Sequence, residues 1–166
     1  PTQTLTSTLS PTPQPTPTFT GSGGLIAFVS DRSDDGTFQI FTMRPDGSEV
    51  TQITFDEGDK SQPCWSPDGS ELLFVADGGG SLGLEIYRYD FSPALPLNLT
   101  NSAGDDYDPA WSYDGTKIAF TSERVNGLRQ VFVMNDDGSD QQFWSRGYAV
   151  EFEPYWSPEG DVLAVV

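Results

Sequence analysis

The stretch PCWSPDGSELLF, from Pro63 to Phe74, is written three times in this chain with small changes. The second copy, PAWSYDGTKIAF, covers residues 109–120, and the third, PYWSPEGDVLAV, covers residues 154–165. The tryptophans of the three copies recur at spacings of 46 and 45 residues: Trp65, Trp111 and Trp156. A period of this length is typical of repeat proteins, in which each small unit stacks on its neighbours to bury its apolar residues.

Each repeat contains four short strand candidates, separated by turn residues. The turn SPDG at residues 66–69 follows from its residue types, because proline presets φ, aspartate bonds to nearby backbone and glycine accepts a positive φ. The second strand of each repeat is apolar on both faces, as in ELLFVA, KIAFTS and LIAFVS. A sheet with one face in water would alternate apolar and polar residues, so we expect every sheet to be covered on both sides. The strands predicted for the middle repeat are Gln62–Ser66, Glu71–Ala76, Leu84–Tyr89 and Leu97–Thr100.

Small four-stranded sheets that repeat around an axis form a β-propeller, whose sheets are called blades. The repeated tryptophan is then predicted to lie between adjacent blades, where its burial stabilises the fold by roughly 2–3 kcal/mol. The order WSPDG, apolar strand, QIF with an Asp-Gly turn, and IT or LT resembles the TolB-type β-propeller repeat, a relative of the WD-type repeat. The resemblance covers about residues 24–166.

The resemblance implies that the WS segment is the innermost strand of each blade. Residues 25–54 would then form the last three strands of one blade, and residues 153–166 the first two strands of another. Residues 62–100 and 108–144 would form two complete blades between them. The predicted fold class is therefore all-β, an incomplete β-propeller of about three blades plus part of a fourth, whereas TolB-like rings have about six blades. We expect the chain to be a fragment whose apolar end faces associate with the remaining blades of the propeller or with a second copy.

The N-terminal segment differs in composition from the repeats. Residues 1–22 consist mostly of proline, threonine and serine, which cannot bury enough apolar surface to offset the entropy of ordering. We predict a disordered linker or stalk over residues 1–22 and a partial TolB-like propeller over residues 23–166. A Pro/Thr-rich stalk favours display outside the cytoplasm, in a bacterial periplasm or on a cell surface. No run of eighteen apolar residues is present, so no membrane insertion is predicted in this segment.

The composition of the chain excludes several classes of partner and of chemistry. With 25 acidic against 8 basic residues, the net charge is −17, which repels nucleic acids and anionic lipids and suits a cationic partner. Histidine is absent, so neither a Ser-His-Asp or Cys-His catalytic site nor a histidine zinc site can be assembled within this chain. The single cysteine, Cys64, is predicted to be a small buried residue and not a nucleophile.

Acidic residues gather in the loops that enter the innermost strands. In a propeller these loops meet at one mouth of the central channel, so their like charges favour a cation or a basic side chain. We predict an acidic rim that binds a basic peptide segment or a divalent cation; the alternative is a solvated rim without a ligand. The candidate partner-binding residues are Asp59, Asp105, Asp106, Asp108, Glu151 and Glu153.

One loop resembles the opening of an EF-type calcium loop. Residues 31–36 read DRSDDG, which places candidate oxygen ligands at Asp31, Ser33 and Asp35. The twelfth position of such a loop would be Thr42 instead of an acid, and predicted strands flank the loop. A plain hairpin connection is the preferred interpretation, so we predict no metal site and no cofactor, with calcium as the one candidate.

The residues and the resemblance together favour a non-catalytic, extracytoplasmic scaffold that binds a protein or peptide partner at the channel mouth. The alternative is the propeller domain of a larger enzyme, a prolyl-oligopeptidase-like peptidase or a polysaccharide lyase, whose catalytic residues lie outside this chain. A third interpretation is the receptor domain of a membrane-anchored signalling protein.

Overall fold

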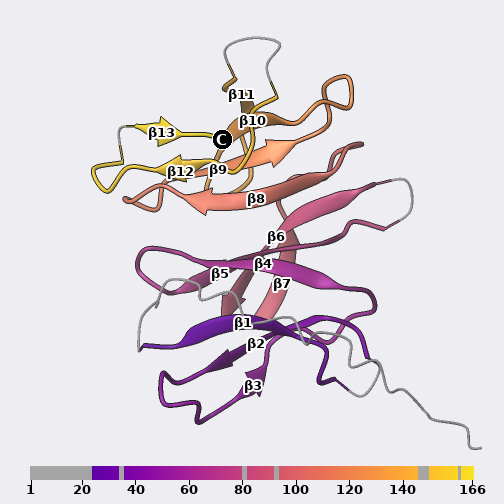
Figure 1. The fold of residues 1–166 in the computed structure, drawn as a ribbon, viewed down its shortest axis with the longest axis vertical. Coiled ribbons are helices and arrows are strands. Elements are labelled where there is room, and N and C mark those ends of the chain that lie inside the picture. Colours follow the sequence, from indigo (N-terminus) through magenta and orange to yellow (C-terminus); the bar gives the residue numbers. More distant parts are fainter. Residues whose placement is uncertain (1–23, 34–35, 80–81, 92–93, 146–149, 161) are drawn as a thin grey trace, which may run out of the picture.

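The structure is a computed structural model that describes residues 24–166, apart from 34–35, 80–81, 92–93, 146–149 and 161. Every regular element among these residues is a β-strand, and the strands form four antiparallel sheets stacked along the long axis of the molecule (Figure 1). In this part of the chain no helix is long and apolar enough to cross a membrane. The predicted linker over residues 1–22 lies outside the described residues, so its boundary with the propeller stays a prediction.

The four sheets follow one another in chain order, as the blades of a propeller do. Blade 1 has the strand order β1-β2-β3, blade 2 β4-β5-β6-β7, blade 3 β8-β9-β10-β11, and blade 4 β12-β13. In blades 1 and 2 the strands are β1 Ile26–Ser30, β2 Gln39–Met43, β3 Thr51–Gln52, β4 Lys60–Trp65, β5 Glu71–Asp77, β6 Leu84–Phe91 and β7 Ala94–Asn98. In blades 3 and 4 they are β8 Asp106–Trp111, β9 Lys117–Ser122, β10 Gln130–Asn135, β11 Gln142–Phe143, β12 Tyr155–Trp156 and β13 Leu163–Ala164.

This arrangement confirms the predicted fold class, an all-β partial propeller with three, four, four and two strands in successive blades. The fourth strand of blade 2 was placed wrongly at Leu97–Thr100, because it begins at Ala94. The third strand, β6, runs on to Phe91, beyond its predicted end at Tyr89, and Phe91 pairs directly with Ala94. The longer hairpin draws the fourth strand three residues towards the N-terminus.

Two apolar clusters join blades 1, 2 and 3. One lies between blades 1 and 2, and the other lies between blades 2 and 3. Alternate residues of β5 enter opposite clusters, so that Leu72 and Phe74 face blade 1 while Leu73 and Val75 face blade 3. The sheet of blade 2 is therefore covered on both faces, as its apolar sequence predicted. The first seam, between blades 1 and 2, consists of Ala27, Ile40, Ile53, Trp65, Leu72, Phe74 and Ala76. The second seam, between blades 2 and 3, consists of Leu73, Val75, Ile86, Leu99, Trp111, Ile118, Phe120, Phe132 and Met134.

The repeated tryptophans lie between blades, as predicted. Trp65 is 5% exposed in the first seam and Trp111 is 8% exposed in the second. Trp156 is only partly buried, and its indole Nε1 donates a hydrogen bond to the carbonyl of Ala110 in blade 3, at 3.2 Å. Each tryptophan therefore contacts the blade that precedes its own in the chain.

The SPDG turns form through the local bonds that their residue types predict. Ser66 Oγ donates to Asp68 Oδ1 at 2.7 Å, and the backbone N–H of Ser70 donates to the same oxygen at 3.0 Å. Gly69 has a φ of 70°. Asp114 accepts equivalent bonds in blade 3. These hydrogen bonds hold the pKa of each carboxyl below its ordinary value. The largest contribution comes from Ser70 for Asp68 and from Ser112 for Asp114.

The innermost strands carry an irregularity that the sequence did not predict. The pairing of β4 with β5 shifts register between Ser61 and Cys64, and the pairing of β8 with β9 shifts between Tyr107 and Ala110. Inside these bulges, and at the same repeat position before β12, three residues other than glycine have a left-handed backbone: Gln62 at φ 51°, Asp108 at φ 54° and Glu153 at φ 50°. A bulge re-aims the side chain of its extra residue, here at the inner edge of each blade.

Candidate functional site

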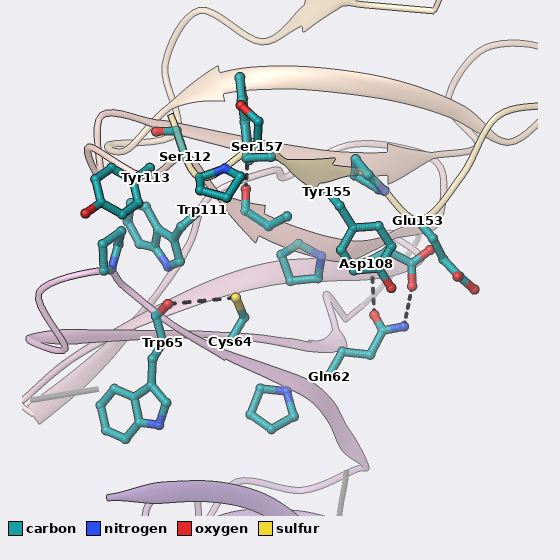
Figure 2. A pocket seen from close by; sticks show the side chains of 17 residues that line it. Gln62, Cys64, Trp65, Asp108, Trp111, Ser112, Tyr113, Glu153, Tyr155 and Ser157 are labelled. Carbon is teal, nitrogen blue, oxygen red and sulfur yellow. Dashed lines mark hydrogen bonds between the residues drawn. The ribbon is translucent and has the colours of Figure 1, made fainter. Parts of the chain in front are cut away.

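The innermost strands of blades 2, 3 and 4 line an open groove of about 820 Å³ (Figure 2). Its wall is built from the repeated WS segments, so prolines and aromatic rings recur along it. One end is formed by the turns that follow the strands, where Tyr113 is 67% exposed. The other end is formed by the three left-handed residues, Gln62, Asp108 and Glu153.

The three left-handed residues are joined by hydrogen bonds across blades. Gln62 Nε2 donates to Asp108 Oδ1 at 2.6 Å, and the backbone N–H of Asp108 donates to Gln62 Oε1 at 2.8 Å (Figure 2). Thr121 Oγ1 donates to Asp108 Oδ2 at 3.0 Å and accepts the backbone N–H of Glu153 at 3.1 Å. The carboxylate of Asp108 is thus held on both oxygens. The carboxylate of Glu153 is exposed, and no described residue donates a hydrogen bond to it.

A second hollow of about 410 Å³ adjoins this end of the groove, and we call it the mouth. It shares Gln62, Asp108 and Glu153 with the groove and is also lined by Asp105, Tyr107, Glu123 and Arg129, among others. Arg129 Nε lies 3.3 Å from Glu123 Oε1, and its guanidinium lies 5.2 Å from the ring centroid of Tyr107. The Tyr107 hydroxyl donates to Glu123, and burial together with this carboxylate raises the pKa of Tyr107 well above its ordinary value. With four acids and one arginine among these residues, the mouth is negative.

Two of the predicted rim residues fasten loops to the preceding blade. Asp59 Oδ1 accepts the backbone N–H of Phe38 at 2.9 Å, and Asp105 Oδ1 accepts that of Leu84 at 2.9 Å. Both bonds tie the loop before an innermost strand to the blade before it, at the start of β2 in blade 1 and of β6 in blade 2. Asp105 also lines the mouth, whereas Asp59 does not.

The remaining predicted residues divide between the mouth and the interior. Asp108 and Glu153 line the mouth. Asp106 is fully buried, and its Oδ2 lies 2.8 Å from Arg124 Nη2, so it is out of a partner's reach. Glu151 is half-buried outside the mouth, and its backbone N–H donates to the carbonyl of Arg129. The structure therefore brings Asp105, Asp108 and Glu153 together, and not the whole predicted rim.

The sequence interpretation missed three residues of the mouth: Gln62, Glu123 and Arg129. Gln62 could have been found, since it occupies the repeat position of Asp108 and Glu153, but only charged residues were considered. Glu123 directly follows β9 and Arg129 directly precedes β10, and nothing in their local sequence shows that this connection reaches the mouth.

The structure does not test the calcium prediction at residues 31–36. Ser33 Oγ donates to the carbonyl of Thr37 at 2.8 Å, and Ser33 accepts the N–H of Gly36 through its own carbonyl, as in a hairpin connection. Asp31 is exposed, and Asp35 lies outside the described residues. Within the described residues, no three or more of histidine, cysteine, aspartate and glutamate are grouped to hold a metal ion.

Cys64 is packed against the second seam and is partly exposed. Burial raises the pKa of its thiol, so the sulfur stays protonated at neutral pH. Cys64 was predicted to be buried, and the structure shows a small packing residue that is only partly buried.

Comparisons with known proteins agree with this architecture. The family model PD40, TolB beta propeller domain, matches residues 57–166. The TolB homologue of Chlorobium luteolum is 31% identical over 144 residues, which are 87% of this chain and 31% of that protein. The crystal structure of TolB from Acinetobacter baumannii superposes with a TM-score of 0.74 at 27% identity, covering 90% of this chain and 36% of that one.

A shorter similarity links the chain to a peptidase. Dipeptidyl-peptidase 5 of Porphyromonas gingivalis is 34% identical over 59 residues, which are 36% of this chain and 9% of that protein. The chain spans only about a third of the length of these two TolB proteins. The blade order, the recurring WS strands and the family match over most of the propeller lead to one conclusion: this chain belongs to the TolB β-propeller family.

Proposed function

We propose that this chain is a non-catalytic, extracytoplasmic interaction module and that its mouth binds an extended basic segment of a protein partner. The observation that carries the proposal is the junction of two hollows. The apolar groove and the acidic mouth share the side chains of Gln62, Asp108 and Glu153. An extended peptide could therefore lay apolar or proline residues along the groove and place a lysine or arginine at the shared end.

The charge distribution supports a cationic partner. Glu153 offers an exposed carboxylate without a donor among the described residues, and Asp108 lies beside it at the mouth. An exposed ion pair stabilises a complex by only about 0–1 kcal/mol, so most of the affinity would come from packing in the groove. The net charge of −17 would instead speed the approach of a basic partner and give the binding a strong dependence on salt.

The proposal is tested by titrating the protein with an extended peptide that alternates lysine with proline and leucine, and with its glutamine-for-lysine counterpart. We expect the lysine peptide to bind more tightly. Glu153→Gln should weaken that binding by about two- to fivefold, because it removes one exposed ion pair. Glu159→Gln removes an equal charge at an exposed turn of the same blade, outside both hollows, and should leave the affinity unchanged. Equal affinity for the two peptides, or equal effects of the two substitutions, would contradict the proposal.

A second candidate is the substrate-filtering propeller of a larger peptidase. The similarity to dipeptidyl-peptidase 5 over 59 residues favours it. Since the chain has no histidine, a Ser-His-Asp site would have to lie outside it. Labelling the full-length parent protein with a serine-reactive fluorophosphonate separates the two functions. Labelling that is lost when the parent's own serine nucleophile is replaced would favour the peptidase, and an unlabelled parent would favour the interaction module.

A further inference from the structure

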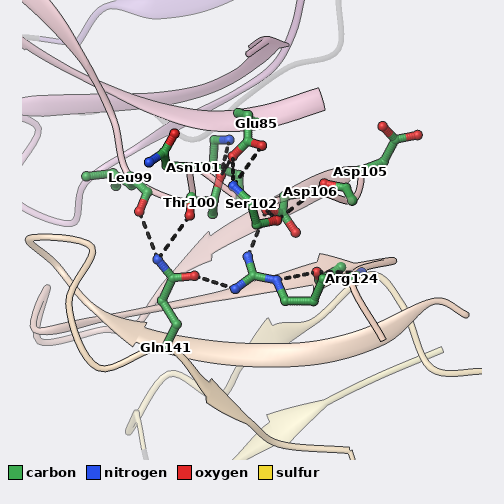
Figure 3. Close-up of polar contacts among 12 residues, drawn as sticks. Glu85, Leu99, Thr100, Asn101, Ser102, Asp105, Asp106, Arg124 and Gln141 are labelled. Carbon is green, nitrogen blue, oxygen red and sulfur yellow. Dashed lines mark hydrogen bonds and ion pairs between the residues drawn. The ribbon is translucent and has the colours of Figure 1, made fainter. Parts of the chain in front are cut away.

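We propose that Glu85 is a proton-dependent latch in the second seam: with its proton it fastens the loop at residues 101–105 between blades 2 and 3, and without it the loop loosens. Glu85 lies near the start of β6 and is fully buried (Figure 3). Thr100 Oγ1 donates to its Oε2, and the backbone N–H of Ser102 lies 3.0 Å from Oε1 and 3.2 Å from Oε2. All these donors come from the segment that leads from blade 2 into blade 3.

A second buried carboxyl group shares this segment. Asp106 is fully buried at the start of β8, and Ser102 Oγ donates to its Oδ2 at 2.9 Å. Arg124 Nη2 lies 2.8 Å from the same oxygen, while its Nη1 donates to Gln141 Oε1 at 2.5 Å (Figure 3). Gln141 in turn donates to the carbonyl of Leu99 at 2.9 Å, which closes the network between the two blades.

One guanidinium cannot neutralise two buried carboxylates. Arg124 makes its ion pair with Asp106, so Glu85 is the carboxyl group that no described cation contacts. Burying an ion without such a partner is so unfavourable that the group takes up a proton instead. The second oxygen of Asp106, Oδ1, has no hydrogen-bond partner among the described residues, so this acceptor too is left without a donor there.

The repeat provides an independent argument for a neutral group at this position. Gln39 and Gln130 occupy the places of Glu85 in blades 1 and 3, and both are buried. Thr54 Oγ1 donates to Gln39 Oε1 at 2.7 Å, just as Thr100 donates to Glu85. A protonated glutamate resembles a glutamine in shape and charge, so blade 2 holds an ionisable version of a side chain that is otherwise a neutral amide.

The surrounding charges determine the direction of the pH dependence. Burial raises the pKa of Glu85 above its ordinary value and Asp106 raises it further, against the lowering effects of Thr100, Ser102 and Arg124. The other acids on the adjoining segments are engaged elsewhere. Asp77, at the end of β5, is exposed and accepts the N–H of Gly79, and Asp105 accepts the N–H of Leu84. Tyr87 follows on β6, and its own pKa is raised chiefly by burial.

The sign of the effect on stability follows from this direction. The folded protein keeps the Glu85 proton at pH values where the unfolded chain has released it. The stabilisation is therefore complete below the ordinary value of 4.5 and is lost as the pH rises through the folded pKa. When Glu85 loses its proton, its carboxylate and that of Asp106 repel each other, and Ser102 is hydrogen-bonded to both. Ser102 lies in the same loop as Asp105, which lines the mouth. The latch does not depend on whether the mouth binds a partner.

The test compares Glu85→Gln with Glu57→Gln, which removes the same charge from an exposed loop residue. The melting temperature and the amide exchange of residues 101–105 are measured from about pH 5 to about pH 8. We expect the unmodified protein and Glu57→Gln to lose melting temperature and protection in this loop as the pH rises. Glu85→Gln should keep its protection and melt at a higher temperature than the unmodified protein at about pH 8.

Two outcomes would overturn the latch. One is a pH dependence of loop protection in Glu85→Gln equal to that of the unmodified protein. The other is a Glu85→Gln variant that is destabilised at every pH, because the amide is as neutral as the protonated acid and keeps one acceptor oxygen for Thr100 or Ser102. Asp106→Asn provides a second reading, since removing the neighbouring carboxylate should move the loss of protection to lower pH. A shift to higher pH would contradict the proposal.

Discussion

The two seams between blades are alike in their apolar half, the cluster around the repeated tryptophan, and differ in their polar half, the buried charged residue and its partners. Lys60 and Asp106 occupy the same position, the first residue of the innermost strand, and both are buried. In the first seam, Lys60 Nζ donates to the backbone carbonyls of Glu57 and Gly58, at 3.0 and 2.9 Å. In the second seam, Asp106 is neutralised by Arg124. The comparison shows that the repeat determines the apolar packing, whereas each loop adapts to the polar residue that points inward.

The largest expected effect concerns the apolar half that the seams share. Trp65→Ala and Trp111→Ala should each lower the free energy of unfolding by about 3–5 kcal/mol, because each leaves a cavity between two blades. Trp156→Ala should have a clearly smaller effect, since that side chain is only partly buried. Urea unfolding followed by circular dichroism measures all three. A change in the free energy of unfolding below about 0.5 kcal/mol for Trp111→Ala would mean that this side chain is not packed between two blades.

The next effect separates the polar halves. Arg124→Met keeps an unbranched side chain over Phe120 and Phe132 but leaves Asp106 buried without a cation, which should cost about 3–5 kcal/mol. Lys60→Met removes the donor from the carbonyls of Glu57 and Gly58, which should cost about 1–3 kcal/mol. The same unfolding experiment compares them. If Lys60→Met were the more damaging substitution, the distinction between the two seams would be wrong.

The apolar half was predictable from the sequence because it repeats. The period of the tryptophans, the doubly apolar second strands and the SPDG turns predicted repeated sheets, and the resemblance to the TolB-type repeat then implied blades at residues 25–54, 62–100, 108–144 and 153–166. The structure has one sheet for each of these ranges, although β4 and β8 begin two residues earlier, at Lys60 and Asp106. Each of these signals is local in sequence, so neighbouring residues were enough to detect it.

The polar half and the mouth were predictable only in part, for two physical reasons. First, the acids were predicted to face solvent, but Asp106 is buried. Its charge is paired with that of Arg124, eighteen residues further along the chain, and only the fold brings the two together. Second, a left-handed backbone at Gln62, Asp108 and Glu153 has no glycine to signal it. The bulge that aims these side chains at the channel was therefore not detectable, although their shared repeat position was.

The smallest effect concerns the turns, in which the two seams are alike. The lowered pKa of Asp68 means that its contribution is present above the ordinary value of 3.8 and is lost as the pH falls through the folded pKa. Asp68→Asn should therefore reduce the melting temperature slightly at neutral pH and have no effect at about pH 2. Asp114→Asn should behave in the same way in blade 3. A turn substitution with equal effects at both pH values would show that the ionised carboxylate is not what stabilises these turns.

The central claim is that blade 2 is sandwiched between two seams, with β5 buried on both faces. Native-state hydrogen exchange tests it most directly, because amides covered on both sides open only in large-scale unfolding. The account predicts that Leu72, Leu73, Phe74 and Val75 exchange more slowly than the amides of β12 and β13, whose side chains are partly or fully exposed. Exchange in β5 as fast as in β12 and β13 would contradict it.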